Sequence, residues 1–347
     1  MLKSAPVVLA GNHVKAAPAL HGREIPFSHG ADFCALTFAF SCDRVRKKSK
    51  RGDALMKKIL KAFLIVIAVI AAAFAALVVK IVSDAGKQAE EQKKMVKPDE
   101  ELIGERFSMP RDGLEAVEMN LYLRPDADKL PLVINLHGGA FIAGHADTLD
   151  SQSDRISKAW NVHVATVNYK LVSKDYDIAY AVREVADTVK YFIRNAEEYR
   201  VNPDKIYVMG YSAGGYHAMA SVLALRREGV PVAGQIVCYG FLRDVMDIYA
   251  ETSAEMPPSL FVVAEGDPIG ESSLTYAEAL RERGVSVEIK TYSGAMHGFI
   301  EENNPEYEKL RSHASMSPEQ EAMARDAENC IGNWIAAQST RKALVGE

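Results

Sequence analysis

Residues 205–215 read KIYVMGYSAGG and contain a G-x-S-x-G pattern centred on Ser212. The apolar run Ile206 to Met209 predicts a buried strand before the serine, and Ala213 to Ala224 is rich in residues that favour a helix after it. A serine on a tight turn between a strand and a helix is held in a strained backbone conformation, with its hydroxyl lifted clear of the sheet. We therefore interpret Ser212 as a nucleophile on a strand–turn–helix elbow.

The composition indicates a folded domain with an acidic surface. The chain has 347 residues, 48% of them hydrophobic, so it can bury a large core. Residues 1–61 carry 12 Lys and Arg against 4 Asp and Glu, a net charge of +8. Because the whole chain has a net charge of −5, the remaining residues carry −13. Nucleic-acid binding requires clustered Lys and Arg for phosphate contacts. An acidic domain without a basic stripe excludes that class.

An apolar run in the first hundred residues predicts a membrane anchor. Residues 62–79, AFLIVIAVIAAAFAALVV, are 18 consecutive residues without a charged or hydrogen-bonding side chain, close to what a membrane-spanning helix needs. Basic residues crowd the segment before the run, and mixed charges follow it. The positive-inside rule then leaves the N-terminus in the cytoplasm. We expect a single-pass protein whose catalytic domain is extracytoplasmic.

Two features of this region leave alternatives open. Ala73-Phe74-Ala75 could serve as a cleavage site, in which case the apolar run is a signal peptide and the domain is secreted. Residues 56–82 begin with a methionine and a short basic region, as export and anchor segments do. Residues 1–55 show no sustained period and are assigned no fold. They are an N-terminal extension that could be a start-site artefact.

The remaining domain limits follow from the pattern of polar and apolar residues. Residues 83–101 are polar and charged, and predict a solvated tether. Residues 102–338 read as one catalytic domain without an internal repeat, and 339–347 as a tail. Cys238 lies in an apolar strand pattern, so we expect a buried thiol there, not a disulfide with Cys330. No metal-ligand spacing is present, and no cofactor is expected.

Apolar runs and helical patterns alternate along this domain, which is typical of a parallel sheet covered by helices on both faces. The fold class is therefore α/β. Short apolar runs predict central strands at 132–136, 162–167, 206–209, 235–239 and 260–264; 115–122 alternates like an early edge strand, and 285–292 alternates again. Helices are predicted over 182–193, 213–224 and 274–283, and Ser317-Pro318-Glu319-Gln320 opens a last helix with a capping box.

The serine needs a base, because its hydroxyl is a poor nucleophile until a neighbour takes the proton. His297 lies in SGAMHGF, directly after the last predicted strand, at the carboxyl end where open α/β sheets place their sites. His313 sits in a charged, helix-like stretch, and His217 lies on the far side of a turn from Ser212. We therefore predict His297 as the base.

The imidazole in turn needs a carboxylate that fixes its tautomer and stabilises the imidazolium. Asp267 follows the strand at 260–264, again at a carboxyl end. Glu265 is too near the strand end to reach freely, and Asp244 and Asp247 belong to the preceding strand's loop. Asp267 is the predicted partner of the base.

The oxyanion of a tetrahedral intermediate needs hydrogen-bond donors. His137-Gly138-Gly139-Ala140-Phe141 follows the strand at 132–136, and its small residues leave backbone N–H groups unobstructed. The N–H of Ala213, at the start of a helix whose dipole favours negative charge, completes a plausible oxyanion hole.

Taken in order, HGGAF, GYSAGG, EGDP and MHGF resemble the α/β-hydrolase superfamily, and within it the hormone-sensitive-lipase-like and acetyl-esterase group. The similarity extends from about Pro131 to Phe299. Ala140 stands where glycine is usual, and Tyr211 where an acidic residue is common. The resemblance implies an α/β-hydrolase fold, a triad of Ser212, Asp267 and His297, and oxyanion donors at Gly138, Gly139, Ala140 and Ala213.

These patterns predict a membrane-anchored serine hydrolase that cleaves short-chain carboxylic esters through an acyl-enzyme on Ser212. The expected partners are a small-molecule ester, with an acylated carbohydrate outside the cell as one candidate, and the membrane through residues 62–79. A minimal cap is expected, because only about 35 residues separate the end of the tether from His137 and only 16 separate Gly240 from Pro257. The alternatives are a peptidase of the same fold and a non-catalytic binding domain on that scaffold.

Overall fold

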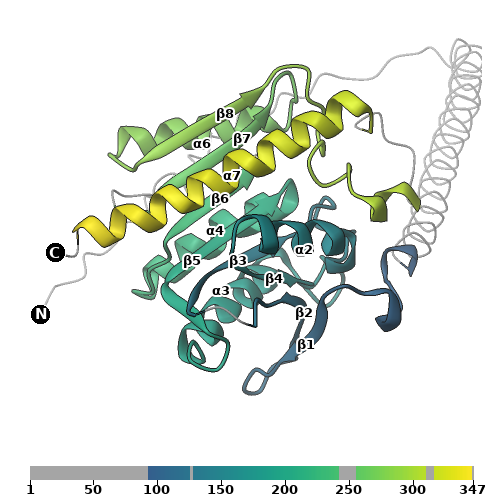
Figure 1. Cartoon of the computed structure of the whole chain (residues 1–347), viewed down its shortest axis with the longest axis vertical. Coiled ribbons are helices and arrows are strands. Elements are labelled where there is room, and N and C mark those ends of the chain that lie inside the picture. The colour runs from purple at the N-terminus through teal and green to yellow at the C-terminus, as the bar shows by residue number, and fades with distance from the viewer. Residues whose placement is uncertain (1–92, 126–127, 242–254, 310–315, 346–347) are drawn as a thin grey trace, which may run out of the picture. The chain divides into compact units, whose positions relative to one another are not determined.

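The computed structural model describes residues 93–125, 128–241, 255–309 and 316–345 (Figure 1). The predicted extension at 1–55 and the predicted anchor at 62–79 lie outside these residues. Within the described part of the chain, no helix is both long and apolar enough to cross a membrane.

A sheet of eight strands forms the centre of the described domain, in the order β1-β2-β4-β3-β5-β6-β7-β8. β2 pairs antiparallel with β1 and with β4, and all other neighbouring strands are parallel. The strands are β1 (Glu105–Met109), β2 (Val117–Tyr122), β3 (Leu130–Leu136), β4 (His163–Val167), β5 (Val201–Tyr211), β6 (Gly234–Cys238), β7 (Ser259–Ala264) and β8 (Val287–Tyr292).

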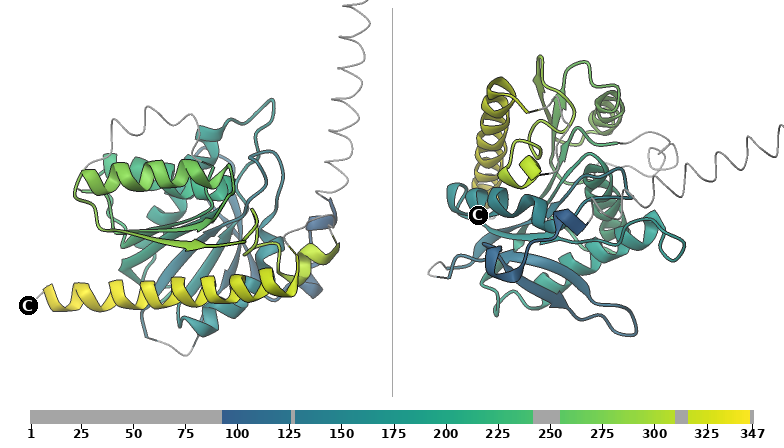
Figure 2. Two further views of the ribbon diagram at one scale, coloured as in Figure 1. Left: turned by 90° about the horizontal axis from the view of Figure 1, so that it is seen from above. Right: turned by 90° about the vertical axis from the view of Figure 1, so that its right-hand side faces the viewer.

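Helices cover both faces of the sheet, as the alternating pattern predicts (Figure 2). One face packs against α3 (Ile178–Arg194), α4 (Ala213–Arg227) and α6 (Gly270–Glu282), and the other against α2 (Asp150–Ala159) and α7 (Pro318–Val345). Short 3-10 helices lie at Asp99–Glu101, Ala146–Leu149 and Pro305–Lys309. The α/β-hydrolase fold expected from the sequence is confirmed.

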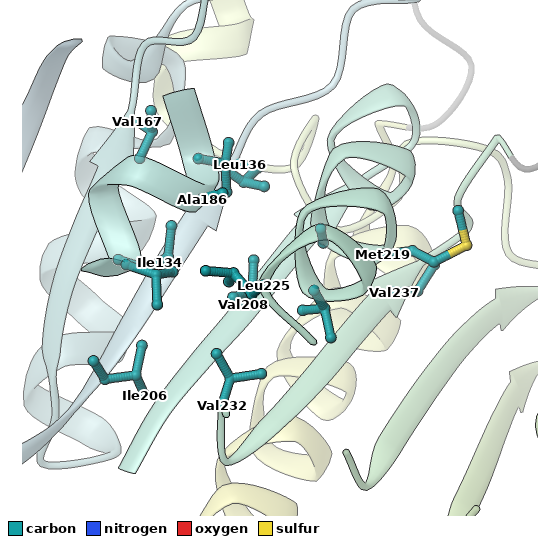
Figure 3. Packing of buried hydrophobic residues seen from close by; sticks show 14 of the residues in the cluster. Ile134, Leu136, Val167, Ala186, Ile206, Val208, Met219, Leu225, Val232 and Val237 are labelled. Atoms are coloured by element: carbon teal, nitrogen blue, oxygen red, sulfur yellow. The ribbon is translucent and has the colours of Figure 1, made fainter. Parts of the chain in front are cut away.

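A hydrophobic core between the sheet and helices α3 and α4 packs against the two elements that flank the elbow. Ile134 of β3 and Val208 of β5 are fully buried and belong to one hydrophobic cluster with Ala186 of α3 and Met219 of α4 (Figure 3). Each such side chain stabilises the fold by about 1.5–3 kcal/mol when it is a fully buried Val, Leu, Ile or Met. Because β5 and α4 both lie in this core, the turn between them has little freedom to relax.

Several predicted boundaries change for a physical reason. The sequence predicts that the strand at 115–122 is at the edge of the sheet, but β1 pairs with it and forms the edge instead. β1 reads ERFSM and buries only Met109, so no apolar run predicts it. Helix α2 is absent from the prediction because it reads DSQSDRISKA and buries mainly polar side chains. The predicted tail at 339–347 is wrong up to Val345, where α7 ends.

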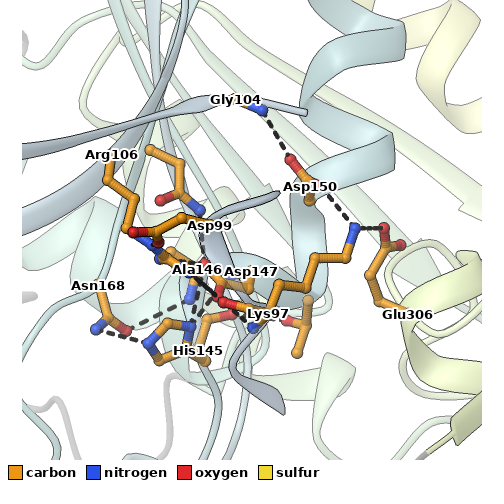
Figure 4. A network of polar contacts seen from close by, with 12 residues as sticks. Lys97, Asp99, Gly104, Arg106, His145, Ala146, Asp147, Asp150, Asn168 and Glu306 are labelled. Carbon is orange, nitrogen blue, oxygen red and sulfur yellow. Dashed lines mark hydrogen bonds and ion pairs between the residues drawn. The ribbon is translucent and has the colours of Figure 1, made fainter. Parts of the chain in front are cut away.

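The last part of the predicted tether is docked onto the domain (Figure 4). The Nζ of Lys97 lies 2.6 Å from Asp150 Oδ2 and 2.9 Å from Glu306 Oε1. Arg106 donates to both carboxylate oxygens of Asp147, at 3.0 and 2.9 Å. Asp147 and Asp150 are fully buried. The expected solvated tether at 83–101 is therefore wrong from Lys97 onward, where the chain already belongs to the folded unit.

Candidate active site

Ser212 occupies the sharp turn between β5 and α4. Its backbone has φ 50° and ψ −114°, a left-handed conformation that costs energy for a residue other than glycine. The turn is possible because Gly210 has no side chain: a Cβ there would lie 2.1 Å from the carbonyl oxygen of Gly214. The elbow expected from the G-x-S-x-G pattern is thus present, with the serine as the residue before the helix.

The structure brings Ser212, Asp267 and His297 together. Asp267 follows β7 and His297 follows β8, so parallel neighbours deliver both side chains to the edge of the sheet where β5 delivers the serine. His297 Nε2 lies 2.9 Å from Ser212 Oγ, and His297 Nδ1 lies 2.7 Å from Asp267 Oδ2. The other oxygen of Asp267 accepts the N–H of Ile269 at 2.9 Å, which fixes the carboxylate.

Electrostatics favour the working protonation states of this chain of contacts. Burial alone would lower the pKa of His297, but the hydrogen bond and charge of Asp267, with the charges of Glu301 and Glu302, raise it above the ordinary 6.5. Burial would raise the pKa of Asp267, but its bonds to His297 and to backbone N–H groups lower it overall. The pair therefore stabilises an ionised aspartate beside an imidazole that can accept a proton.

The pH dependence of turnover follows from these shifts. The base must be neutral to take the serine proton, so kcat/KM for a nitrophenyl ester should fall as pH decreases through the raised pKa of His297. The depressed pKa of Asp267 keeps that group ionised over the same range. A pH–rate profile of the catalytic domain measures this fall in kcat/KM at acid pH. A midpoint at or below the ordinary 6.5 would contradict the raised pKa, and a rate that does not fall in acid would contradict the assignment of His297 as base.

The loop after β3 has the backbone that an oxyanion hole needs. Gly139, Ala140 and Phe141 all have positive φ, at 126°, 51° and 69°. Gly139 cannot be replaced by a larger residue, because a Cβ would lie 2.0 Å from the carbonyl oxygen of Ala143. Within the described residues no acceptor engages the N–H of Gly139 or Ala140. Ala213 opens α4, where the N–H has no partner inside the helix.

Gly138 is a correction to the predicted donor set. Its N–H donates to Glu301 Oε2 at 2.9 Å, and Glu301 is only 4% exposed. A committed N–H cannot also bind an oxyanion. The structure therefore leaves Gly139, Ala140 and Ala213 as the candidate donors, and gives Gly138 a role in holding the loop.

The two other histidines considered as bases take no part in the site. His217 is buried, its pKa is lowered to about 3 by burial, and its ring meets the edge of Phe141 with centroids 5.4 Å apart. It is a neutral packing residue beside the oxyanion loop. His313, together with Asp244 and Asp247, lies outside the described residues. Glu265 is exposed, and its one hydrogen bond among the described residues is from its backbone N–H to the carbonyl oxygen of Tyr292.

Two supporting side chains lie outside the predicted site. Ser317 Oγ accepts the N–H of Gln320 at 3.2 Å, which is half of the predicted capping box. The Gln320 side chain does not turn back to close the box. It accepts the N–H of Met296 at 2.9 Å and donates to Gly294 at 2.8 Å, so it holds the loop that carries His297. Glu301 is the second such residue, and no local sequence pattern marks it.

Known proteins share this fold. Residues 133–255 and 243–301 match a family model described as the alpha/beta hydrolase fold. An arylesterase of Saccharolobus solfataricus is 28% identical over 209 residues, covering 49% of this chain and 68% of the relative. An esterase of Pyrobaculum calidifontis matches with a TM-score of 0.58 at 23% identity, over 75% of this chain and 94% of that chain. A bacterial heroin esterase matches with a TM-score of 0.56 at 23% identity, over 72% of this chain and 90% of that chain.

The family match covers the segment that holds the elbow, the aspartate, the histidine and the oxyanion loop. The solved structures support the fold, and the sequence relative supports the esterase group within it. The resemblance stated from the motifs is confirmed: the catalytic segment of this chain, residues 133–301, is similar to the α/β-hydrolase superfamily, in its hormone-sensitive-lipase-like esterase group.

Proposed function

We propose that this protein is a serine esterase that hydrolyses carboxylic esters with short acyl groups. The observation that carries the proposal is the position of His297, whose two ring nitrogens lie 2.9 Å from Ser212 Oγ and 2.7 Å from Asp267. Similarity to an arylesterase supports esters as the substrate class.

The reaction follows from these contacts. Ser212 Oγ attacks the ester carbonyl while His297 Nε2 takes its proton, and Asp267 stabilises the imidazolium. The N–H groups of Gly139, Ala140 and Ala213 would bind the oxyanion of the tetrahedral intermediate. The imidazolium then protonates the leaving alcohol, which leaves an acyl group on Ser212. A water molecule, deprotonated by the same imidazole, hydrolyses this acyl-enzyme and restores the serine.

The surroundings of the serine support a short acyl group. Phe241 donates its N–H to the carbonyl oxygen of Ser212 at 3.1 Å, and its ring lies 5.9 Å from that of Phe141. Phe141 also meets Tyr216 at 5.4 Å. From Glu105 to His137 the described chain consists of β1, β2, β3 and the connections between them, which leaves little length for a helical cap. Burial of one methylene group contributes about 0.8 kcal/mol to binding, so the methylenes of a long acyl chain that lie outside a pocket add no such binding energy.

A chain-length series tests this substrate class. Nitrophenyl esters from acetate to palmitate should give the highest kcat/KM for acetate or butyrate, and acetylated sugars should be turned over alongside them. Preference for chains of ten carbons or more would refute the short acyl site. Faster turnover of aminoacyl amides than of matched esters would make the protein a peptidase.

A covalent probe separates an enzyme from a non-catalytic binding domain. A fluorophosphonate should label the folded domain on Ser212, and the label should disappear in Ser212→Ala. Folded protein that resists the probe, or labelling that persists in Ser212→Ala, would sink the enzyme proposal.

We further propose that residues 62–79 tether the enzyme to a membrane with the catalytic domain outside the cytoplasm. The uncharged run and the basic residues before it support this proposal. Protease added to intact cells, after the outer membrane of a double-membrane cell is opened, should remove the catalytic domain. If the catalytic domain stays protected from the protease, the proposed orientation is wrong. Release of soluble domain without protease would favour a cleaved signal peptide.

A further inference from the structure

A buried carboxylate lies against the oxyanion loop. Glu301 is 4% exposed, and its Oε2 accepts the N–H of Gly138 at 2.9 Å across 163 residues of sequence. The contact is close, because a Cβ on Gly138 would lie 2.4 Å from Glu301 Oε1. The hydroxyl of Tyr307 lies 3.5 Å from the same Oε2.

The segment that carries Glu301 also carries the catalytic base. His297 and Glu301 are four residues apart, and backbone bonds from Phe299 to Met296 and from Glu302 to Gly298 tighten the chain between them. The N–H of Glu301 donates to the Tyr239 hydroxyl at 3.3 Å, and the Tyr239 ring lies 5.2 Å from that of His297. One turn of chain thus contacts the imidazole on one side and the oxyanion loop on the other.

We propose that Glu301 is a positioning residue for the oxyanion hole: by holding the N–H of Gly138 it orients the following N–H groups of Gly139 and Ala140 toward the reacting carbonyl. The loop has three consecutive residues with positive φ, so its direction depends on where it starts. Gly138 is that start. Among the described residues Glu301 is the side chain that accepts its N–H, while its carbonyl oxygen lies 2.7 Å from His137 Nδ1. The role in catalysis rests on the proposed hydrolase function.

The charge state of Glu301 does not decide this role. Burial raises its pKa to about 7, and the bond from Gly138 and the nearby His297 oppose that rise. A carboxylate and a carboxylic acid both offer an oxygen that accepts an N–H. Other titratable groups that interact with Glu301 are Tyr169, Tyr211, Cys238, Tyr239, Glu302 and Tyr307.

Three variants test the proposal. Glu301→Ala leaves the Gly138 N–H without an acceptor and should lower kcat about 10- to 100-fold with KM within about threefold, because a misplaced oxyanion donor weakens transition-state binding and spares ground-state binding. Glu301→Gln keeps an acceptor oxygen in place and should stay within about fivefold of wild type. Glu328→Gln is the matched control: Glu328 is also 4% exposed, but it contacts Gln152 and Arg155.

Two further readouts separate positioning from general loss of structure. Affinity for a boronic acid that forms a tetrahedral adduct on Ser212 should fall with kcat in Glu301→Ala. The rate of fluorophosphonate labelling should fall likewise, and because it requires no ester, a wrong substrate assignment would leave this test intact. Each value is taken per folded molecule, with the thermal midpoint measured alongside.

The proposal is overturned if Glu301→Ala keeps its labelling rate, if Glu301→Gln loses as much as Glu301→Ala, or if Glu328→Gln loses kcat to the same extent. A failed proposed function looks different, since wild-type protein would then label poorly or turn over no ester at all.

Discussion

Replacement of Asp267 by asparagine should lower kcat about 10⁴-fold, because an amide in this position favours the wrong imidazole tautomer and cannot stabilise the imidazolium. Asp267 Oδ2 lies 2.7 Å from His297 Nδ1, so the change acts directly on the base. The side chains are nearly equal in size, and we expect the thermal midpoint to change little. Steady-state turnover of a nitrophenyl ester and a melting curve measure the two effects.

The control for this variant is Glu265→Gln. Glu265 lies two residues before Asp267, carries the same kind of charge and is exposed. Its replacement should leave kcat within about twofold, because screened surface charges interact weakly. Loss of activity in Glu265→Gln with retention in Asp267→Asn would transfer the role of orienting the imidazole to the rival carboxylate.

Residues whose roles depend on neighbouring sequence could be predicted. Ser212 and Asp267 each follow an apolar strand pattern and His297 follows an alternating one, so the carboxyl edge of a parallel sheet is enough to bring them together. The central strands were found because they are buried on both faces and read as apolar runs. β1 and α2 were not, because an exposed edge strand and a helix that buries polar residues lack a periodic apolar face.

Contacts between distant parts of the chain could not be predicted in this way. Glu301 reaches Gly138 over 163 residues, and Lys97 reaches Asp150 over 53. No spacing rule links such pairs, and their residues look like ordinary surface charges in the sequence. For the same reason, the pattern of small residues in the oxyanion loop suggests four donors, while the direction of each N–H emerges only from the fold.

The largest expected loss of stability comes from Asp150→Ala. Its carboxylate is fully buried and accepts from Lys97 Nζ at 2.6 Å, from the Tyr122 hydroxyl at 2.8 Å, and from the N–H groups of Ile103 and Gly104 at 3.0 and 3.1 Å. Removal leaves several donors without an acceptor. We expect the free energy of unfolding to fall by about 3–5 kcal/mol, as for other broken buried ion pairs. Urea unfolding measures the change.

Asp154→Ala is the matched control for this stability prediction. Asp154 lies one turn along the same helix and pairs with Lys158 at the surface, so its loss should cost less than about 1 kcal/mol. Equal losses in the two variants would show that the docked segment around Lys97 contributes nothing of its own.

The same cluster predicts instability in acid. Burial would raise the pKa of Asp147, but hydrogen bonds from His145, Arg106 and Asn120 lower it well below its ordinary 3.8. A group with a depressed folded-state pKa stabilises the protein above its unfolded pKa and loses that contribution as pH falls through the folded one. Unfolding free energy should therefore decrease below about pH 4. In Asp147→Asn this decrease should be smaller, because the titrating carboxyl is gone, whereas an unchanged pH dependence would assign the acid sensitivity to other carboxyl groups.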